Sequence, residues 1–134
     1  MRKIEHIGIA VKDIDSSNDL FSSLFGKPNY KIEDVESEGV KTSFFMCGPN
    51  KIELLQATTE NSPIAKFIEK KGEGIHHIAF AVDDIEKEIK RLTEEGFEMI
   101  HKVPKKGADS KLIAFLHPKS TNGVLVELCQ DIKV

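Results

Sequence analysis

Two histidines occupy matching positions in two similar segments of this 134-residue chain. The first segment reads IEHIGIAVKDI at 4–14 and the second reads IHHIAFAVDDI at 75–85, and seven of the eleven positions are identical at an offset of 71. The alignment matches His6 with His77. Self-similarity of this kind indicates an internal repeat.

Two glutamates are matched in the same way further along each half. The segment NKIELLQ at 50–56 corresponds to VLVELCQ at 124–130 at an offset of 74, and Glu53 corresponds to Glu127. The longer turn HPKSTNG at 117–123 absorbs the change of offset. The repeat therefore carries one histidine and one glutamate in each half.

These residue types can bind a metal and transfer protons. A carboxylate within an apolar strand needs a partner for its charge. Imidazole nitrogens and carboxylate oxygens together bind divalent first-row metals, and carboxylates serve as general acids and bases. We predict that His6, Glu53, His77 and Glu127 share one cation, which would also hold the two halves together. The other histidines, His76, His101 and His117, are expected to be structural or peripheral.

The elements that must position these residues follow from hydrophobic periodicity and turn signals. Each half is predicted to contain a strand, a helix and three further strands. A further helix begins with Ser62 as N-cap and Pro63 at the first helical position, and it links the two halves. We expect strands at 4–11, 29–35, 40–47, 51–56, 75–82, 97–102, 111–117 and 124–130, and helices at 16–25, 62–72 and 84–95.

Strand parity places the four polar side chains away from the packing faces. Alternate residues of a strand point to opposite faces, so His6 lies with Gly8 and Ala10, and His77 lies with two alanines. The side chains of Glu53 and Glu127 likewise point to the face opposite that of their apolar neighbours in the sequence. The predicted packing faces carry Ile7, Ile9, Val11, Ile52, Leu54, Ile78, Phe80, Val82, Val126 and Leu128.

Composition excludes several classes of protein. A formal charge of −3 and a pI near 6.0 give no reason to expect nucleic acid as a partner. No run approaches the roughly 20 apolar residues that cross a bilayer, so no membrane partner is expected. Cys47 and Cys129 each lie in an apolar run, which predicts buried free thiols. These features favour the cytoplasm.

The quoted segments resemble the vicinal oxygen chelate superfamily, also called glyoxalase-like, over essentially the whole chain. Within it, KIELLQ, SPIAKFIEKKGEGIHHIAFAVDDI and FLHPKSTNGVLVELCQ are similar to the methylmalonyl-CoA epimerase family. The resemblance implies an α+β fold in which two tandem βαβββ modules form a curved mixed sheet around a metal site. The single domain 1–134 would comprise modules 1–60 and 74–134, joined by the helix 62–72.

The resemblance also implies an activity, an isomerase that interconverts (R)- and (S)-methylmalonyl-CoA by moving the C2 proton through a metal-bound enolate. The family's ligand positions correspond to His6, Glu53, His77 and Glu127. Glu53 and Glu127 would also be the acid and base, when loosened from the metal. The implied cofactor is one divalent ion, with Co²⁺ closest to the family and Mn²⁺, Ni²⁺ and Zn²⁺ as other candidates. The implied partners are an acyl-CoA substrate and a second copy in a homodimer.

One position departs from the family, and other functions remain open. Some relatives place a glutamate base on the third strand, where this chain has Thr42. A glyoxalase I-type lactoylglutathione lyase would use the same four ligands. An extradiol dioxygenase normally uses two histidines and one carboxylate, so the second glutamate argues against it. A metal-free binding protein, like the bleomycin-resistance proteins, is the non-enzymatic alternative.

Overall fold

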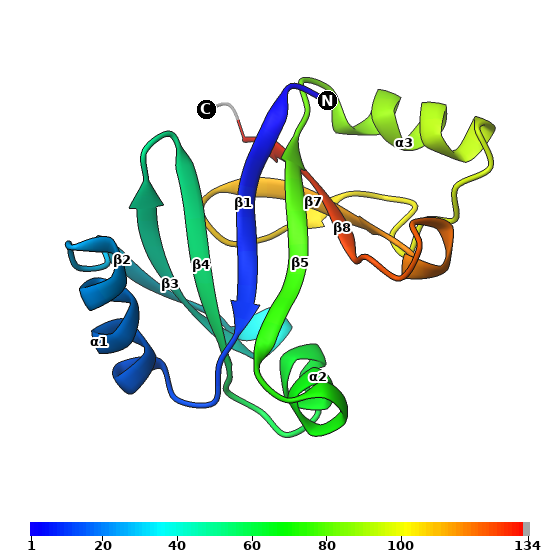
Figure 1. Ribbon diagram of the computed structural model, residues 1–134. Coiled ribbons are helices and arrows are strands. Elements are labelled where there is room, and N and C mark those ends of the chain that lie inside the picture. Colours follow the sequence, from blue (N-terminus) through cyan, green and yellow to red (C-terminus); the bar gives the residue numbers. More distant parts are fainter. Residues whose placement is uncertain (133–134) are drawn as a thin grey trace. The chain divides into compact units, whose positions relative to one another are not determined.

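The computed structural model describes residues 1–132, which divide into two compact units. The N-terminal unit is His6–His76. The C-terminal unit contains Met1–Glu5 and, among the described residues, 77–132. Each unit has its own set of strands (Figure 1) and its own clusters of packed hydrophobic residues.

In the N-terminal unit the sheet has the strand order β2-β3-β4-β1. The β1–β4 pair is parallel, and the β2–β3 and β3–β4 pairs are antiparallel. Its elements are β1 (Lys3–Ala10, whose first three residues fall in the other unit), α1 (Ile14–Phe25), β2 (Lys31–Val35), β3 (Val40–Cys47), β4 (Asn50–Ala57) and α2 (Pro63–Lys71).

The C-terminal unit repeats this arrangement with the order β5-β8-β7-β6. Its β5–β8 pair is parallel, and its other two pairs are antiparallel. The elements are β5 (Gly74–Ala81, whose first three residues fall in the N-terminal unit), α3 (Ile85–Glu94), β6 (Lys105–Lys106), β7 (Lys111–Leu116) and β8 (Val126–Asp131). The predicted α+β fold with two βαβββ repeats is therefore confirmed.

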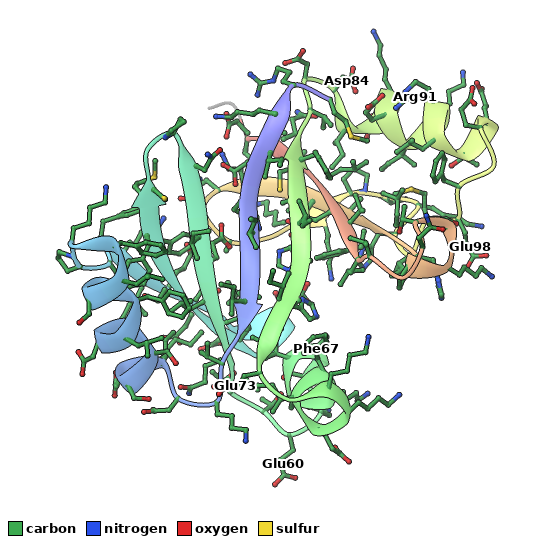
Figure 2. The ribbon with its side chains drawn as sticks, viewed as in Figure 1. Glu60, Phe67, Glu73, Asp84, Arg91 and Glu98 are labelled. Atoms are coloured by element: carbon green, nitrogen blue, oxygen red, sulfur yellow. The ribbon has the colours of Figure 1, made fainter. Side chains whose placement is uncertain are left out.

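The repeated Asp-Ile dipeptide begins the helix in each unit. Asp13 accepts a hydrogen bond from the Ser16 amide, and Asp84 accepts one from the Lys87 amide, each at 3.1 Å. These aspartates are N-caps, which satisfy amides that have no partner within the helix. Figure 2 shows Asp84 at the start of α3. The hydrogen bonds from Ser16 lower the pKa of Asp13 below its usual value.

The sheet of the N-terminal unit packs on both faces. Leu54 joins the cluster under α1, whereas Leu55 joins a second cluster with Ile64 of α2. Because consecutive strand residues point to opposite faces, α1 and α2 cover opposite sides of β4. Glu53 shares parity with Leu55 and so faces away from α1. The predicted N-cap of α2 is confirmed, since the Ser62 hydroxyl accepts from the Ala65 amide at 3.1 Å.

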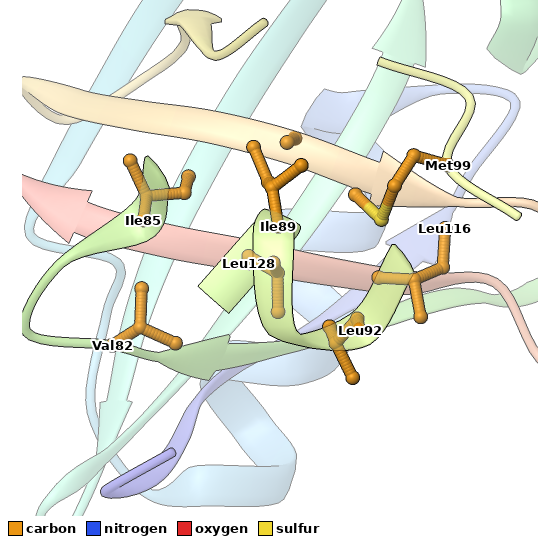
Figure 3. Packing of buried hydrophobic residues seen from close by; sticks show 8 residues of the cluster. Val82, Ile85, Ile89, Leu92, Met99, Leu116 and Leu128 are labelled. Atoms are coloured by element: carbon orange, nitrogen blue, oxygen red, sulfur yellow. The ribbon is translucent and has the colours of Figure 1, made fainter. Parts of the chain in front are cut away.

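In the C-terminal unit, α3 supplies an apolar stripe to one face of the sheet. Ile85, Ile89 and Leu92 recur at helical spacing and pack against Leu116 of β7 and Leu128 of β8 (Figure 3). Val82, Met99 and Ala114 complete this cluster. Because Leu128 points toward α3, its neighbours in sequence on β8 point to the other face.

The predicted strand at 97–102 is wrong. In this stretch only Met99 forms a bridge, with Leu116, and the strand β6 lies further on at Lys105–Lys106. The amide of Phe115 donates to Nδ1 of His101 rather than to a backbone carbonyl, at 3.1 Å. Pro104 also has no amide hydrogen to extend the ladder. The His101 side chain therefore interrupts the backbone ladder here, although the Ile100 amide still donates to the Phe115 carbonyl and the His117 amide to the Glu98 carbonyl, each at 2.8 Å.

The prediction that neither cysteine forms a disulfide is confirmed, whereas the predicted burial is confirmed for Cys129 and wrong for Cys47. Both are free cysteines, but Cys129 is buried on β8 whereas Cys47 is exposed at the end of β3. The strand places Cys47 beside the turn to β4, beyond the packed part of the sheet. Among residues 1–132, no helix has both the length and the apolar character needed to cross a membrane.

Candidate metal centre

In the N-terminal unit, His6 and Glu53 lie together on neighbouring parallel strands. The residue directly opposite Glu53 on β1 is Gly8, which has no side chain to fill that face. His6 lies two residues before Gly8 and therefore on the same face. Its Nδ1 is 3.1 Å from Oε2 of Glu53, and both residues are only 4% exposed. The pair is thus buried and in direct polar contact.

The C-terminal unit contains the equivalent pair. Glu127 on β8 lies opposite Ala79 on β5, and His77 precedes this small residue by two positions. Nε2 of His77 is 2.9 Å from Oε1 of Glu127, and both residues are 5% exposed. The same local rule therefore produces both pairs: a small residue faces the glutamate, and the histidine lies two residues before that small residue on the same face.

A phenylalanine faces each glutamate from the strand on its other side. Phe44 pairs with Glu53 across β3 and β4, and Phe115 pairs with Glu127 across β7 and β8. The Phe115 ring also meets the His77 ring edge-on, with centroids 5.5 Å apart and an angle of 85°. Such rings exclude water from the carboxylates and strengthen local electrostatics. Phe44 and Phe115 are 71 positions apart in the sequence, which is also the offset between His6 and His77. The internal repeat could therefore have identified this pair of phenylalanines.

A glutamine three residues after each glutamate holds the end of its strand. Oε1 of Gln56 accepts a hydrogen bond from the Ile14 amide, and Oε1 of Gln130 accepts one from the Ile85 amide, each at 2.7 Å. These amides belong to the first turns of α1 and α3, where helices lack internal acceptors. Both glutamines are present in the repeated segments, yet sequence reasoning gave them no role.

The donor set fits a divalent cation. Two ligands about 2.1 Å from one ion are about 3 Å apart when they occupy neighbouring octahedral positions. The nitrogen-to-oxygen distances of 3.1 Å and 2.9 Å match that separation. A cation bound between the imidazole nitrogen and the carboxylate oxygen of a pair would balance the charge of the carboxylate. The residues predicted as ligands therefore have the chemistry and spacing that metal binding requires.

Thr42 and two further histidines, which the sequence analysis also singled out, lie at defined places in the sheet and its turns. Thr42 is 1% exposed on β3, two residues before Phe44, and it pairs with Leu55. His117 caps a turn by accepting from the Lys119 amide at 3.1 Å, and His101 accepts from Phe115 as described above. Both histidines thus bond to the backbone, as their predicted structural role requires.

A family model described as the Glyoxalase/Bleomycin resistance protein/Dioxygenase superfamily matches residues 5–115. The chain therefore belongs to this superfamily, in agreement with its two βαβββ units and their paired histidines and glutamates. Within the superfamily it belongs to the methylmalonyl-CoA epimerase family, as the following relatives show.

The mitochondrial methylmalonyl-CoA epimerase of Dictyostelium discoideum is 42% identical over 127 residues, which are 94% of this chain and 76% of that protein. The ethylmalonyl-CoA/methylmalonyl-CoA epimerase of Cereibacter sphaeroides is 40% identical over 130 residues, 96% of this chain and 97% of that protein. A solved structure of the Streptomyces coelicolor methylmalonyl-CoA epimerase in complex with 2-nitronate-propionyl-CoA has a TM-score of 0.94 and 32% identity, covering 100% of this chain and 97% of that chain.

Similarity to lactoylglutathione lyases is much weaker. The enzyme from Arabidopsis thaliana is 25% identical over 130 residues, which are 96% of this chain but only 44% of that protein. The comparisons thus favour the epimerases over the glyoxalase I-type alternative.

Proposed function

We propose that this chain is a methylmalonyl-CoA epimerase that interconverts the (R) and (S) forms by removing and returning the C2 proton. The observation that carries this proposal is the buried histidine–glutamate pair in each repeat. The family membership supports the substrate, because relatives over the whole chain length have this activity in their names. The solved relative with a bound CoA thioester supports an acyl-CoA ligand.

We propose that His6, Glu53, His77 and Glu127 bind one divalent ion. Mixed nitrogen and oxygen ligands suit Co²⁺, Mn²⁺, Ni²⁺ and Zn²⁺, and the family resemblance favours Co²⁺. When bound, the ion would stabilise the negative charge that develops on the thioester oxygen as C2 loses its proton. The support from this chain is the spacing of the donor atoms within each pair.

Glu53 and Glu127 are the proposed acid and base, and each acts in this way when its carboxylate is loosened from the metal. One carboxylate begins ionised and takes the C2 proton, and the electron pair of the C–H bond moves toward the thioester carbonyl. The other carboxyl group begins protonated and gives its proton to the opposite face of C2, which inverts the centre. Phe44 and Phe115 face these groups and would keep bulk water from them during each proton transfer, while the carboxyl groups exchange their protons with solvent between turnovers. The reverse reaction exchanges the two roles.

We further propose that the protein is a homodimer in the cytoplasm. The family resemblance supports the dimer, and the free thiols fit a reducing compartment. Light scattering of the purified protein gives the molar mass that tests the assembly.

The deciding experiment measures exchange of the C2 proton of methylmalonyl-CoA for deuterium by Co²⁺-loaded protein. We expect Glu127→Gln to lower the exchange rate at least about 1,000-fold, because the amide neither accepts nor returns the proton. Glu98→Gln is the matched control, since this glutamate is exposed and pairs with Lys119 at 2.8 Å; it should keep the rate.

Three outcomes would contradict the proposal. Near-normal exchange in Glu127→Gln removes this residue from catalysis. Isomerisation of a glutathione hemithioacetal, without C2 exchange, supports the lactoylglutathione lyase. Less than about a tenth of an equivalent of bound metal after incubation with Co²⁺ or Mn²⁺ supports the metal-free binding protein.

A further inference from the structure

The Glu127 carboxylate is held from two sides by side chains of the C-terminal unit. Its Oε1 lies 2.9 Å from Nε2 of His77, and its Oε2 accepts a hydrogen bond from Sγ of Cys129 at 3.2 Å. Cys129 follows Glu127 by two residues on β8, so both side chains project from the same face. The two oxygens therefore have different partners, one an imidazole and the other a thiol.

This division of contacts determines how the carboxylate meets an ion. A carboxylate can bind a cation through one oxygen or through both. Oε1 is the oxygen beside His77 and is therefore the one that can share an ion with this histidine. The thiol hydrogen bond holds Oε2 on the side of Cys129 and so favours this rotation of the carboxylate. Groups that hold a ligand in this way strengthen metal binding.

We propose that Cys129 is a positioning residue, whose thiol holds Oε2 of Glu127 so that Oε1 is presented to the ion bound by His77. This inference rests on the proposed metal site. The ligand it concerns is a divalent cation.

A packing role alone would explain the burial of Cys129 but not its contact with Glu127. Cys129 is 2% exposed and clusters with Ala79 and Ile113. The matching position in the N-terminal repeat is Leu55, which is also buried and has no group to donate. An apolar residue therefore suits this place in the repeat, and the thiol adds a hydrogen bond that packing does not require.

Three substitutions separate positioning from packing. Cys129→Ser retains a donor, Cys129→Val fills similar volume without one, and Cys129→Ala removes both donor and volume. The measurements are the Kd for Co²⁺ by titration, the visible absorption spectrum of the bound Co²⁺, and the thermal unfolding of each metal-free protein. Cys47→Ser is the matched control, because it alters an exposed thiol at the end of β3.

We expect Cys129→Val and Cys129→Ala to raise the Kd for Co²⁺ about tenfold and to alter the Co²⁺ spectrum, while Cys129→Ser stays within about threefold of the original protein. For methylmalonyl-CoA, kcat should fall in the valine variant with KM unchanged. Cys47→Ser should alter none of these quantities.

Unchanged Co²⁺ affinity and spectrum in the valine variant would overturn the positioning role and leave the metal site intact. Absence of Co²⁺ binding by the original protein would overturn the metal site itself, and the positioning role with it. If the alanine variant does not fold, the valine and serine variants still decide between donor and packing.

Discussion

A glutamate that is almost fully buried keeps its charge only when neighbouring groups stabilise the carboxylate. Glu53 and Glu127 each have an imidazole within about 3 Å for this purpose. Each also faces a phenylalanine ring, which offers no hydrogen bond in place of water. Removing one member of such a pair leaves an uncompensated buried polar group, which is why we expect large effects from single substitutions.

Glu53 and Thr42 can be distinguished as the second proton-transfer group. A threonine hydroxyl is a much weaker base than a carboxylate. We therefore expect the C2 deuterium exchange rate of Thr42→Val to stay within about threefold of that of the original protein. Glu53→Gln should lower it at least about 100-fold. Both variants are compared at equal Co²⁺ content, so that loss of metal is not mistaken for loss of a base. Equal losses in the two variants would assign Thr42 a part in the proton transfer.

The strands and helices could largely be predicted because hydrophobic parity and helix caps are local signals. Parity correctly put Glu53 on the face opposite Leu54, and Ser62 with Pro63 correctly marked the start of α2. The prediction of a strand at 97–102 failed because the Phe115 amide donates its hydrogen bond to the His101 side chain. These two residues are 14 positions apart, so a local sequence pattern does not reveal the contact. The hydrogen bond of Cys129 was missed because it depends on side-chain rotation, which residue spacing does not specify.

The glutamine contacts tie each glutamate-bearing strand to a helix of the same unit. We expect Gln130→Leu to lower the free energy of unfolding by about 1 kcal/mol, because the Ile85 amide loses its acceptor. Gln130→Glu should keep most of the stability, since it retains an acceptor and adds negative charge at the start of α3. Denaturant unfolding of the metal-free variants checks both values. Equal stability of the leucine variant and the original protein would show that water replaces the glutamine.

At the scale of the whole molecule, the proposed metal links folding to ligation. Each unit contributes one histidine and one glutamate, and only folded protein brings such residues together. Any ligand that binds the folded state alone stabilises it in proportion to the logarithm of ligand concentration. Metal content should therefore be fixed before the stabilities of variants are compared.

We expect Co²⁺ at a free concentration 100 times its Kd to raise the free energy of unfolding by about 2.7 kcal/mol. Calorimetry should show a rise in Tm of roughly 10 °C, which a chelator reverses. His77→Ala should lose most of this rise because it removes one proposed ligand. An identical rise in the original protein and in His77→Ala would place the stabilising ion elsewhere.

The pairing of each glutamate with the histidine of its own unit also bears on ancestry. A gene encoding one βαβββ repeat would already specify a finished imidazole–carboxylate pair, and two separate products of that gene could have supplied a full set of four donors. Tandem fusion would then have allowed the copies to diverge independently. Cys129 in one copy and Leu55 in the other record such divergence beside an inherited glutamate.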